Sequence, residues 1–341
     1  MTQLQSISAT NRHEYLNRRY SKVAVLLTEQ FSLLSLTSLT DVLDMVQVAS
    51  SVHYVDVSLH TLSGDTIRSR SGVKVVPDCS LSDGFPRKGQ VPKPDMYFIC
   101  SGKKLSQNEA DSILALVRRC RVSAIPVCVI GAAIPLIAQS GHLSKGTDHW
   151  SRIPVNRETC PNVEFQECIF VRDGKLVSCS GELGAMDFAL HWVEANICAK
   201  AAAWIRSHLL LQSVRSAGRK QTCTTADRYR GIPKKLEHAI ELMLDHMEEL
   251  LPIQEIADRV GMSTRQLERL FKQELNTSPL KFYRAQQLDL GWRLIEDTNM
   301  QISEISVACG FMSTSSFATL FKDKFGQTPM AFRKSRAQSP V

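Results

Sequence analysis

Apolar residues in the last third of the chain recur at the spacing of amphipathic helices, and the same pattern is written twice. The first copy begins at Ile253 and the second at Ile302, and each carries a glycine at the matching place, Gly261 and Gly310. The register holds through both copies, apart from one residue inserted in the turn of the second. A register kept over this length indicates an internal repeat.

Each copy of the repeat predicts two short helices that meet at a tight turn. In the first copy, apolar residues such as Ile256 and Leu267 have the spacing of two helices that cross over a small core. Gly261 falls where the first helix must end with a positive φ, which glycine adopts at little cost. Ser263 follows as the N-cap of the second helix, with Gln266 three residues later as in a capping box. The pattern therefore predicts a helix-turn-helix in each copy.

The second helix of each copy is predicted to turn a polar face outward. The side chains on these faces are of the types that read base edges and contact phosphates. They are Thr264, Arg265, Gln266, Arg269, Lys272 and Gln273 in the first copy, and Thr314, Ser315, Ser316, Thr319 and Lys322 in the second. We therefore predict that these faces bind double-stranded DNA, with Arg265, Arg269 and Lys272 at guanine edges or phosphates and Gln266 at adenine.

The segment from Lys234 to Lys334 resembles the DNA-binding domain of AraC/XylS-type transcription regulators. Its second copy, GFMSTSSFATLFKDKFGQTPMAFRK, lies close to the signature of that family. The resemblance implies two helix-turn-helix units, joined by one long helix from Pro279 to about Asp297, that enter successive major grooves. It also implies RNA polymerase as a partner, and activation more than repression. This chain has Gln287 where the family commonly has arginine, and Gly291 where it commonly has alanine.

The preceding part of the chain alternates short apolar runs with stretches of helical spacing. The runs at 23–27 and 127–130 are wholly apolar, as expected of strands buried on both faces, and apolar residues between 33 and 48 recur at helical spacing. This alternation predicts an α/β domain with a flavodoxin-like parallel sheet and helices on both faces. Ligands of such folds bind beyond the carboxyl ends of the strands, where the loops that follow the strands are expected to converge.

Changes in composition divide the chain into four parts. Residues 1–20 are polar and without periodicity, which predicts a mobile tail, and residues 213–232 are polar and basic, which predicts a linker. Between them lies the α/β domain, 21–212, and after the linker lies the all-α domain, 233–336.

Composition also limits the class of protein. An apolar content of 43% and a charged content of 22% over 341 residues are ordinary for a soluble globular protein, and a formal charge of +7 is compatible with an anionic polymer as partner. Ten cysteines occur without a C-x-x-C pair or zinc-ligand spacing, and no secretory leader is recognised, which predicts reduced thiols in the cytoplasm. The longest apolar run, 125–138, is too short to cross a bilayer. No membrane association, metal or cofactor is expected.

Residues 21 to about 200 resemble the class I glutamine amidotransferase-like domain of the PfpI type. The stretches that carry the resemblance are VAVLLTEQFSLLSLTSLTDVLDMV, VCVIGAAIPLIAQSGHLSKGTDHW and FVRDGKLVSCSGELGAMDFALHWVE. Followed by a double helix-turn-helix, this domain gives the arrangement of GlxA-type AraC regulators. The resemblance implies a domain that senses a small effector, an amino acid or a quaternary amine in other members. We also expect a homodimer, for which the helix expected at Leu183–Asn196 is one candidate surface.

The catalytic positions of that superfamily are only partly filled in this chain. Catalytic members place a cysteine on a sharp turn after a buried strand, usually as C-x-G. With Gly131 as the glycine, the nucleophile position falls on Val129, which has no nucleophilic atom, and Cys128 is expected to point to the other face of the strand. The acid position falls on Asp41, and His149 lies in a Thr-x-His-Trp stretch found in the regulators.

We therefore predict a crevice that binds a small metabolite without turning it over. Its expected lining is Asp41, Val129, Ile130, Gly131, His149 and Trp150. Plainer roles stay open for three residues: Cys128 as a buried structural thiol, His149 as an internal hydrogen-bonding group, and Asp41 as a local cap or pairing partner.

The sequence as a whole predicts a ligand-responsive, sequence-specific transcription regulator and not an enzyme. Two alternatives stay open. One is a PfpI-type cysteine hydrolase or glyoxalase-like enzyme, fused to a DNA-binding domain, that uses Cys128. The other is a nucleoid-type structural protein that binds DNA without a signal and with little base preference.

Overall fold

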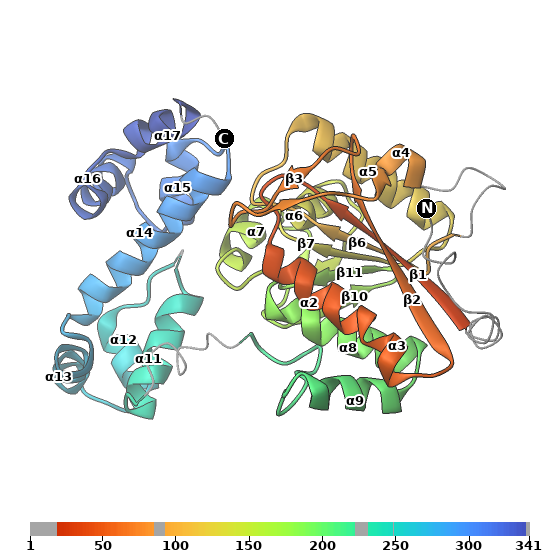
Figure 1. Ribbon diagram of the computed structural model, residues 1–341. Coiled ribbons are helices and arrows are strands. Elements are labelled where there is room, and N and C mark those ends of the chain that lie inside the picture. The colour runs from red at the N-terminus through yellow and green to blue at the C-terminus, as the bar shows by residue number, and fades with distance from the viewer. Residues whose placement is uncertain (1–18, 85–92, 222–230, 248, 339–341) are drawn as a thin grey trace, which may run out of the picture. The chain divides into compact units, whose positions relative to one another are not determined.

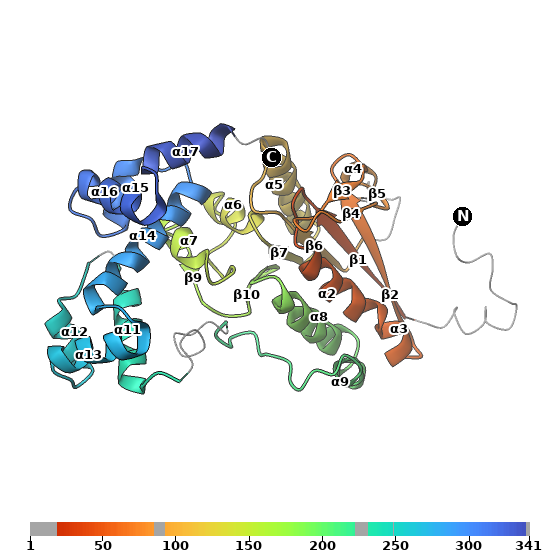
Figure 2. The ribbon, with the colours of Figure 1, turned by 60° about the vertical axis from the view of Figure 1, so that its left-hand side comes forward.

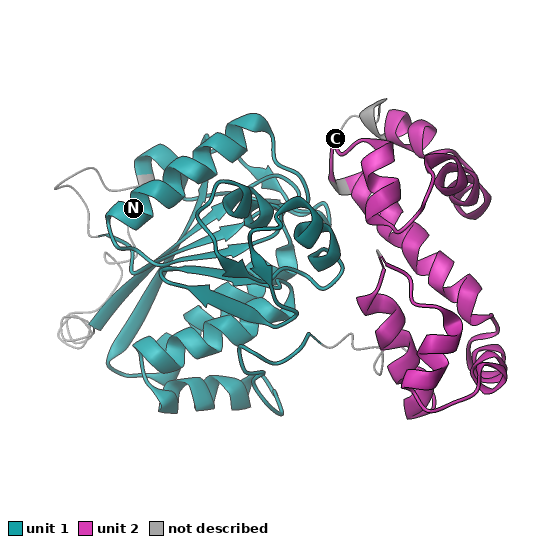
Figure 3. Cartoon of the chain, turned by 180° about the vertical axis from the view of Figure 1, so that it is seen from behind, with its two compact units in different colours: residues 1–221 teal, residues 222–341 magenta. Residues whose placement is uncertain are grey.

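The computed structural model describes residues 19–84, 93–221, 231–247 and 249–338. The chain divides into two compact units, 1–221 and 222–341 (Figure 3). Each unit has its own hydrophobic core, so we describe the two separately.

Unit 1 is built around a seven-stranded, mostly parallel sheet with the strand order β10-β11-β7-β6-β1-β2-β5 (Figure 1). The edge strand β10 pairs antiparallel with β11, while the other neighbours run parallel. The strands of this sheet are β1 (Arg19–Leu27), β2 (His53–Thr61), β5 (Cys79–Ser80), β6 (Met96–Cys100), β7 (Val127–Ile130), β10 (Phe170–Asp173) and β11 (Leu176–Cys179). Two small ribbons are formed by β3 (Ile67–Arg68) with β4 (Lys74–Val75), and by β8 (Lys145–Gly146) with β9 (Glu164–Phe165).

Helices cover both faces of the sheet (Figures 1 and 2). The core on one face is closed by α2 (Leu33–Asp44), α3 (Val46–Ala49), α8 (Leu183–Asn196) and α9 (Ala199–His208). The core on the other face is closed by α5 (Gln107–Val122), α6 (Ala133–Gln139) and α7 (Ile153–Thr159), and a short helix, α4 (Leu81–Gly84), follows β5. The predicted α/β fold is confirmed.

Strand β1 shows why the apolar runs are continuous. Val23, Val25 and Leu27 enter the core beneath α2 and α8, whereas Ala24 and Leu26 enter the core beneath α5 and α6. Successive side chains of a strand point to opposite faces of the sheet, so a strand covered on both faces must be apolar at every position.

Two boundaries of unit 1 differ from the prediction. Strand β1 already begins at Arg19, so the predicted tail is too long at its end, and residues 1–18 lie outside the described part of the chain. The stretch predicted to begin a linker at residue 213 belongs to unit 1 as far as Gln221. Its polar side chains bind residues distant in the sequence, as Arg215 binds Asp187. Local composition does not reveal such contacts. Residues 222–230 of the predicted linker also lie outside the described residues.

Unit 2 contains two helix-turn-helix units that share one long helix. The helices are α11 (Lys234–Asp245), α12 (Ile253–Arg259), α13 (Thr264–Leu275), α14 (Pro279–Asp297), α15 (Ile302–Ala308), α16 (Thr314–Phe325) and α17 (Pro329–Gln338). The pairs α12/α13 and α15/α16 form the helix-turn-helix units, and α14 joins them (Figure 1). The predicted organisation of the all-α domain is confirmed.

The turn chemistry follows the sequence signals. Gly261 has φ +66°, and Ser263 and Gln266 form the reciprocal bonds of a capping box at the start of α13. Asn276 and Gly326 take left-handed conformations at the ends of α13 and α16. Because these conformations depend on a few neighbouring residues, local sequence is enough to predict them.

Gln287 ties the two helix-turn-helix units to α14. It lies on α14 between Tyr283, which packs in the core of the first unit, and Trp292, which stacks on Phe321 of the second. The side chain of Gln287 is fully buried. Its Nε2 donates to the carbonyl of Cys309 at 2.6 Å and to that of Met247 at 3.3 Å. Cys309 belongs to the second helix-turn-helix, and Met247 packs against the core of the first. One amide therefore bonds to both halves of the DNA-binding domain.

We expect the substitution Gln287→Met to loosen this junction. Methionine has similar length but no donor, so the carbonyl of Cys309 would lose its partner in a dry setting, and the free energy of unfolding should fall by about 1–3 kcal/mol. Urea titration of the full chain measures the loss. The half-buried neighbour supplies the matched control, Gln286→Met. Equal losses in both variants would show that the buried hydrogen bonds are not the cause.

Candidate DNA interface and ligand crevice

The reading helix of the first helix-turn-helix, α13, presents a charged face to solvent. Arg265 and Arg269 are exposed, and neither takes part in an ion pair within the described ranges. Lys272 is also exposed, and its Nζ donates to Asn276 Oδ1 at 3.0 Å. The structure thus places the three predicted cations on an open helix face.

Two other predicted residues of α13 already make hydrogen bonds within the protein. The Oε1 atom of Gln266 accepts hydrogen bonds from the backbone N–H of Ser263 (2.9 Å) and from its hydroxyl (3.1 Å). Thr264 is half-buried, and its hydroxyl donates to Gln254 Oε1 of α12 at 2.5 Å. A bidentate contact of Gln266 with adenine needs both ends of the amide, so it would require the capping box to open. Thr264 holds α12 against α13.

Glu268 is an exposed residue of α13 that is missing from the predicted set. It stands three residues after Arg265 and four before Lys272, so the three side chains are neighbours on the helix surface. Lys272 would be the natural ion-pair partner of Glu268, yet its Nζ turns to Asn276. A carboxylate in this position can accept a hydrogen bond from cytosine N4. The helical spacing of Glu268 from Arg265 and Lys272 is visible in the sequence and could have placed it on the same face.

The reading helix of the second unit, α16, has a different surface. The predicted residues Thr314, Ser315, Ser316, Thr319 and Lys322 are all exposed. Two of these hydroxyls bond within the helix and its N-cap: Thr319 Oγ1 donates to the Ser315 carbonyl at 3.0 Å, and Ser316 Oγ accepts from Ser313 at 3.0 Å. This face carries small hydroxyls where α13 carries guanidinium groups.

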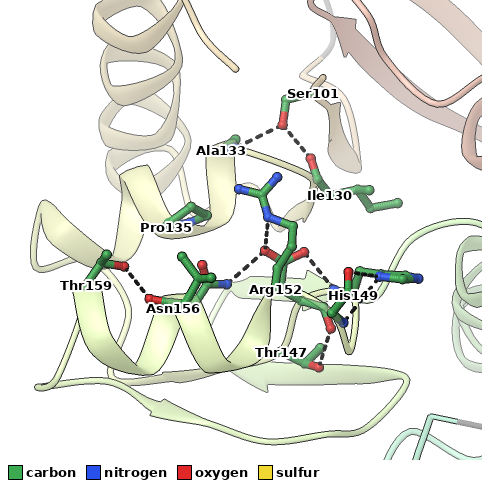
Figure 4. Close-up of polar contacts among 12 residues, drawn as sticks. Ser101, Ile130, Ala133, Pro135, Thr147, His149, Arg152, Asn156 and Thr159 are labelled. Atoms are coloured by element: carbon green, nitrogen blue, oxygen red, sulfur yellow. Dashed lines mark hydrogen bonds and ion pairs between the residues drawn. The ribbon is translucent and has the colours of Figure 1, made fainter. Parts of the chain in front are cut away.

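In unit 1, the turn after β7 is closed by Ser101. Strand β7 ends at Ile130, and Gly131 then takes φ +84° before α6 begins at Ala133. The Ser101 hydroxyl donates to the Ile130 carbonyl (2.6 Å) and accepts from the Ala133 N–H (2.9 Å; Figure 4). A Cβ atom on Gly131 would lie 2.2 Å from the Ser101 carbonyl oxygen. Glycine is therefore required at the point of the turn.

This geometry corrects the position predicted for the nucleophile. Val129 lies inside β7 and not on the turn, and its buried side chain lines an apolar pocket of about 10 Å³ with Ile134 and Ile137. A pocket of this size holds at most about one water molecule, so Val129 does not face a ligand. The residue at the sharp turn is Gly131, because the strand extends two residues further than the C-x-G pattern implies.

The acid at the carboxyl edge of the sheet is Glu182 and not Asp41. Asp41 is exposed in the last part of α2, about 13 Å along the helix from Ser32 at 1.5 Å per residue. Glu182 stands between β11 and α8 with φ +50°, an uncommon value for a side chain other than glycine. Its carboxylate accepts from Ser32 Oγ (2.8 Å) and pairs with Arg70 Nη2 (3.2 Å). The sequence signal for Glu182 was an acid in the short turn between a buried strand and a helix.

His149 lies close to this charged pair. Burial lowers its pKa, while the negative charges of Asp148 and Glu182 act to raise it, and the positive charge of Arg70 acts to lower it. Its Nδ1 shares a hydrogen bond of 2.7 Å with Ser151 Oγ (Figure 4). The predicted neighbour Trp150 packs its ring 5.4 Å from that of His149. Glu182 and Arg70 form an ion pair at the edge where ligands of parallel sheets bind, and the charges of both act on the pKa of His149.

Asp148 anchors the loop that carries His149. Its carboxylate is buried, accepts from the His149 N–H (2.7 Å) and from Asn156 Nδ2 (2.9 Å), and pairs with Arg152 at 3.3 Å (Figure 4). Burial raises the pKa of Asp148, and the Arg152 charge and these hydrogen bonds oppose the rise. The network fixes the backbone of residues 147–150.

Two family models match the chain. The DJ-1/PfpI family model covers residues 21–195, just over half of the 341 residues, and a model described as a helix-turn-helix domain covers residues 256–335. The chain belongs to the DJ-1/PfpI family. In this protein the DJ-1/PfpI domain is followed by an AraC-type helix-turn-helix domain, which confirms the predicted arrangement.

Several relatives match this chain along most of its length. The HTH-type transcriptional regulator CdhR of Pseudomonas aeruginosa is 27% identical over 308 residues, 89% of each chain. The HTH-type transcriptional regulator GlxA of Rhizobium meliloti is 25% identical over 93% of this chain and 97% of its own. The HTH-type transcriptional regulator ArgR of Pseudomonas aeruginosa is 30% identical over 65% of this chain and 68% of its own.

No helix in the described residues combines the length and apolar character needed to cross a membrane. No three His, Cys, Asp or Glu side chains there are gathered in a way that could hold a metal ion.

Cys128 of the DJ-1/PfpI domain points into the core beneath α2 and α8, on the opposite face of β7 from Val129. It is fully buried, and this burial raises the pKa of its thiol well above the ordinary value, with a further rise from the adjacent thiol of Cys179. Because the thiolate is the nucleophile, a thiol in this setting is poorly suited to attack a substrate.

We expect Cys128 to resist alkylation in the native chain. Iodoacetamide near neutral pH should modify the exposed Cys198 at least about a hundredfold faster than Cys128, whose reaction needs prior opening of the core. Peptide mass spectrometry after timed quenching measures both rates, and denaturant should equalise them. Rapid, selective labelling of Cys128 in the folded protein would instead revive the hydrolase alternative.

Proposed function

We propose that this protein is a sequence-specific, DNA-binding transcription regulator controlled by a small effector. The observation that carries the proposal is the pair of helix-turn-helix units held by α14, each with an exposed polar reading helix. The names of the full-length relatives support it. RNA polymerase as partner, homodimer formation, location in the cytoplasm and activation are parts of the same proposal, taken from the family resemblance.

The two reading helices would contribute differently. On α13, Arg265 and Arg269 can make bidentate contacts with guanine, and Glu268 can accept from cytosine, so most base selectivity is assigned to this helix. On α16, the short hydroxyl side chains suit phosphates and closely approached base edges, with Lys322 at a phosphate. DNA binding should therefore depend strongly on the base sequence where α13 contacts the duplex, and only weakly where α16 contacts it.

We expect Arg265→Ala to weaken binding and relax one base position. Loss of a bidentate arginine should cost about 1–3 kcal/mol on the preferred duplex and much less on a duplex changed at that base. Selection from a random-sequence pool, followed by competition titrations at fixed salt, measures both effects. The exposed Arg118 of unit 1 supplies the matched control, Arg118→Ala. Unchanged affinity and base preference would remove α13 as the reader, and a wild-type protein without base preference would favour the nucleoid-type alternative.

The effector site is assigned to the charged group at the carboxyl edge of the sheet. Glu182 offers a partly exposed carboxylate, Arg70 offers a partly exposed guanidinium, and His149 stands beside them. Opposite charges side by side suit a ligand that carries both an ammonium and a carboxylate, such as an amino acid or a betaine. Because Gly131 carries no side chain at the turn and Ser101 closes it, we propose that the ligand is bound without turnover.

We expect an amino acid or betaine to raise the melting temperature of the full chain. A ligand bound only to the folded state stabilises it by about 2.7 kcal/mol at a hundred times its dissociation constant. Glu182→Gln should abolish most of the shift given by the ligand that works in the wild type. Asp41→Asn is the control, because Asp41 is exposed at the far part of α2. Loss of the shift in Asp41→Asn alone would return the acid position to Asp41.

A further inference from the structure

Residues 213–221, which we call the strap, are docked on unit 1 directly before the chain passes to the DNA-binding unit. Arg215 makes three bonds with the buried carboxylate of Asp187 on α8: its N–H and Nε at 2.8 Å each and its Nη2 at 2.6 Å. The carbonyl of Ala217 accepts from the Ile169 N–H at 3.1 Å. A basic, polar segment is thereby held in one place on the surface of unit 1.

The strap ends in a buried glutamine. The side chain of Gln221 is 8% exposed, and both ends of its amide are used. Nε2 lies 2.6 Å from the carbonyl of Asp148, 2.9 Å from that of Cys168 and 3.1 Å from Thr147 Oγ1. Oε1 accepts from the Trp150 N–H at 2.7 Å. Three of these four partners lie in residues 147–150.

Residues 147–150 also carry the crevice residue His149. They therefore form one short loop that bonds Gln221 and also carries a side chain of the proposed effector site. Asp148 holds both sides: its carboxylate bonds the His149 N–H, and its carbonyl bonds Gln221. A shift of this loop should change the hydrogen bonds of Gln221, because three of its four partners lie in the loop.

We propose that Gln221 is the latch that couples the effector crevice to the DNA-binding unit. A ligand that repositions His149 alters the hold of residues 147–150 on Gln221, and so the release of the strap, whose next residue begins the second unit. The inference rests on the proposed function. Regulation requires two states of one element with different affinities for the ligand, and in this proposal they are the docked and the released strap.

The first test needs neither ligand nor DNA. Hydrogen exchange of the full chain is followed in the peptide 214–221. We expect Gln221→Ala to speed exchange there at least about tenfold, since the strap loses the side-chain hydrogen bonds that hold it to residues 147–150 and Cys168. The matched control is the exposed Gln212 changed to Ala, and Gln221→Glu, which keeps one acceptor, guards against a variant that fails to fold. If the loop couples the two sides, His149→Ala also speeds exchange in 214–221. An exchange rate in 214–221 that is the same in His149→Ala as in the wild type would overturn the proposal.

The second test uses a duplex selected by the wild-type chain. Coupling between sites is reciprocal, so DNA binding must change exchange in residues 147–150 if those residues control the strap. We expect a change of at least about twofold in the wild type and none in Gln221→Ala, while the variant still binds the duplex. A wild-type chain that binds the duplex with unchanged exchange in 147–150 contradicts the latch and leaves the regulator intact. A chain that selects no duplex contradicts the regulator itself, and the exchange effect of His149→Ala then decides the latch alone.

Discussion

A glutamine side chain buried away from water must pair its carbonyl and its amide hydrogens, and this requirement governs both joints of the chain. Gln287 meets it between the two helix-turn-helix units, where its amide holds the carbonyls of Cys309 and Met247. Gln221 meets it at the end of unit 1, against residues 147–150 and Cys168. An unpaired amide in either place would cost more than the hydrogen bonds gain, so each joint has one strongly preferred arrangement. The first joint is a rigid spacer, and we propose that the second is a latch.

The edge of the sheet shows how a fold that includes enzymes can present a binding site. The turn after β7 has the sharp geometry that displays a nucleophile in catalytic relatives, but here Gly131 occupies it and the Ser101 hydroxyl fills the space at the start of α6. The polar groups that we propose for the effector site are instead Glu182, Arg70 and His149, which offer charge and hydrogen bonds but no activated nucleophile. The arrangement favours recognition of a charged small molecule over chemistry upon it.

The two reading helices stand on a shared frame but differ in electrostatics. Helix α13 combines guanidinium groups with the carboxylate of Glu268, whereas α16 offers hydroxyls that already bond within the helix. Phosphate contacts supply affinity with little selectivity, and base contacts supply selectivity. We propose that the frame held by Gln287 lets α13 select the base sequence, while α16 adds affinity at a fixed spacing.

Features that depend on neighbouring residues could be predicted from the sequence: the repeat, the glycine turns, the capping box at Ser263, the buried strands and the joining helix α14. Their signals are periodic or lie within a few positions, so local sterics and burial on one face decide them. Features that depend on contacts between distant segments could not be predicted. The turn lies at Gly131 because β7 ends at Ile130 against its neighbours. The acid at the carboxyl edge of the sheet is Glu182 because α8 begins beside Ser32. The predicted linker is docked as the strap because Asp187 and residues 147–150 bind it. Polar residues alone look alike in a sequence, and only the tertiary structure decides which of them find a buried partner.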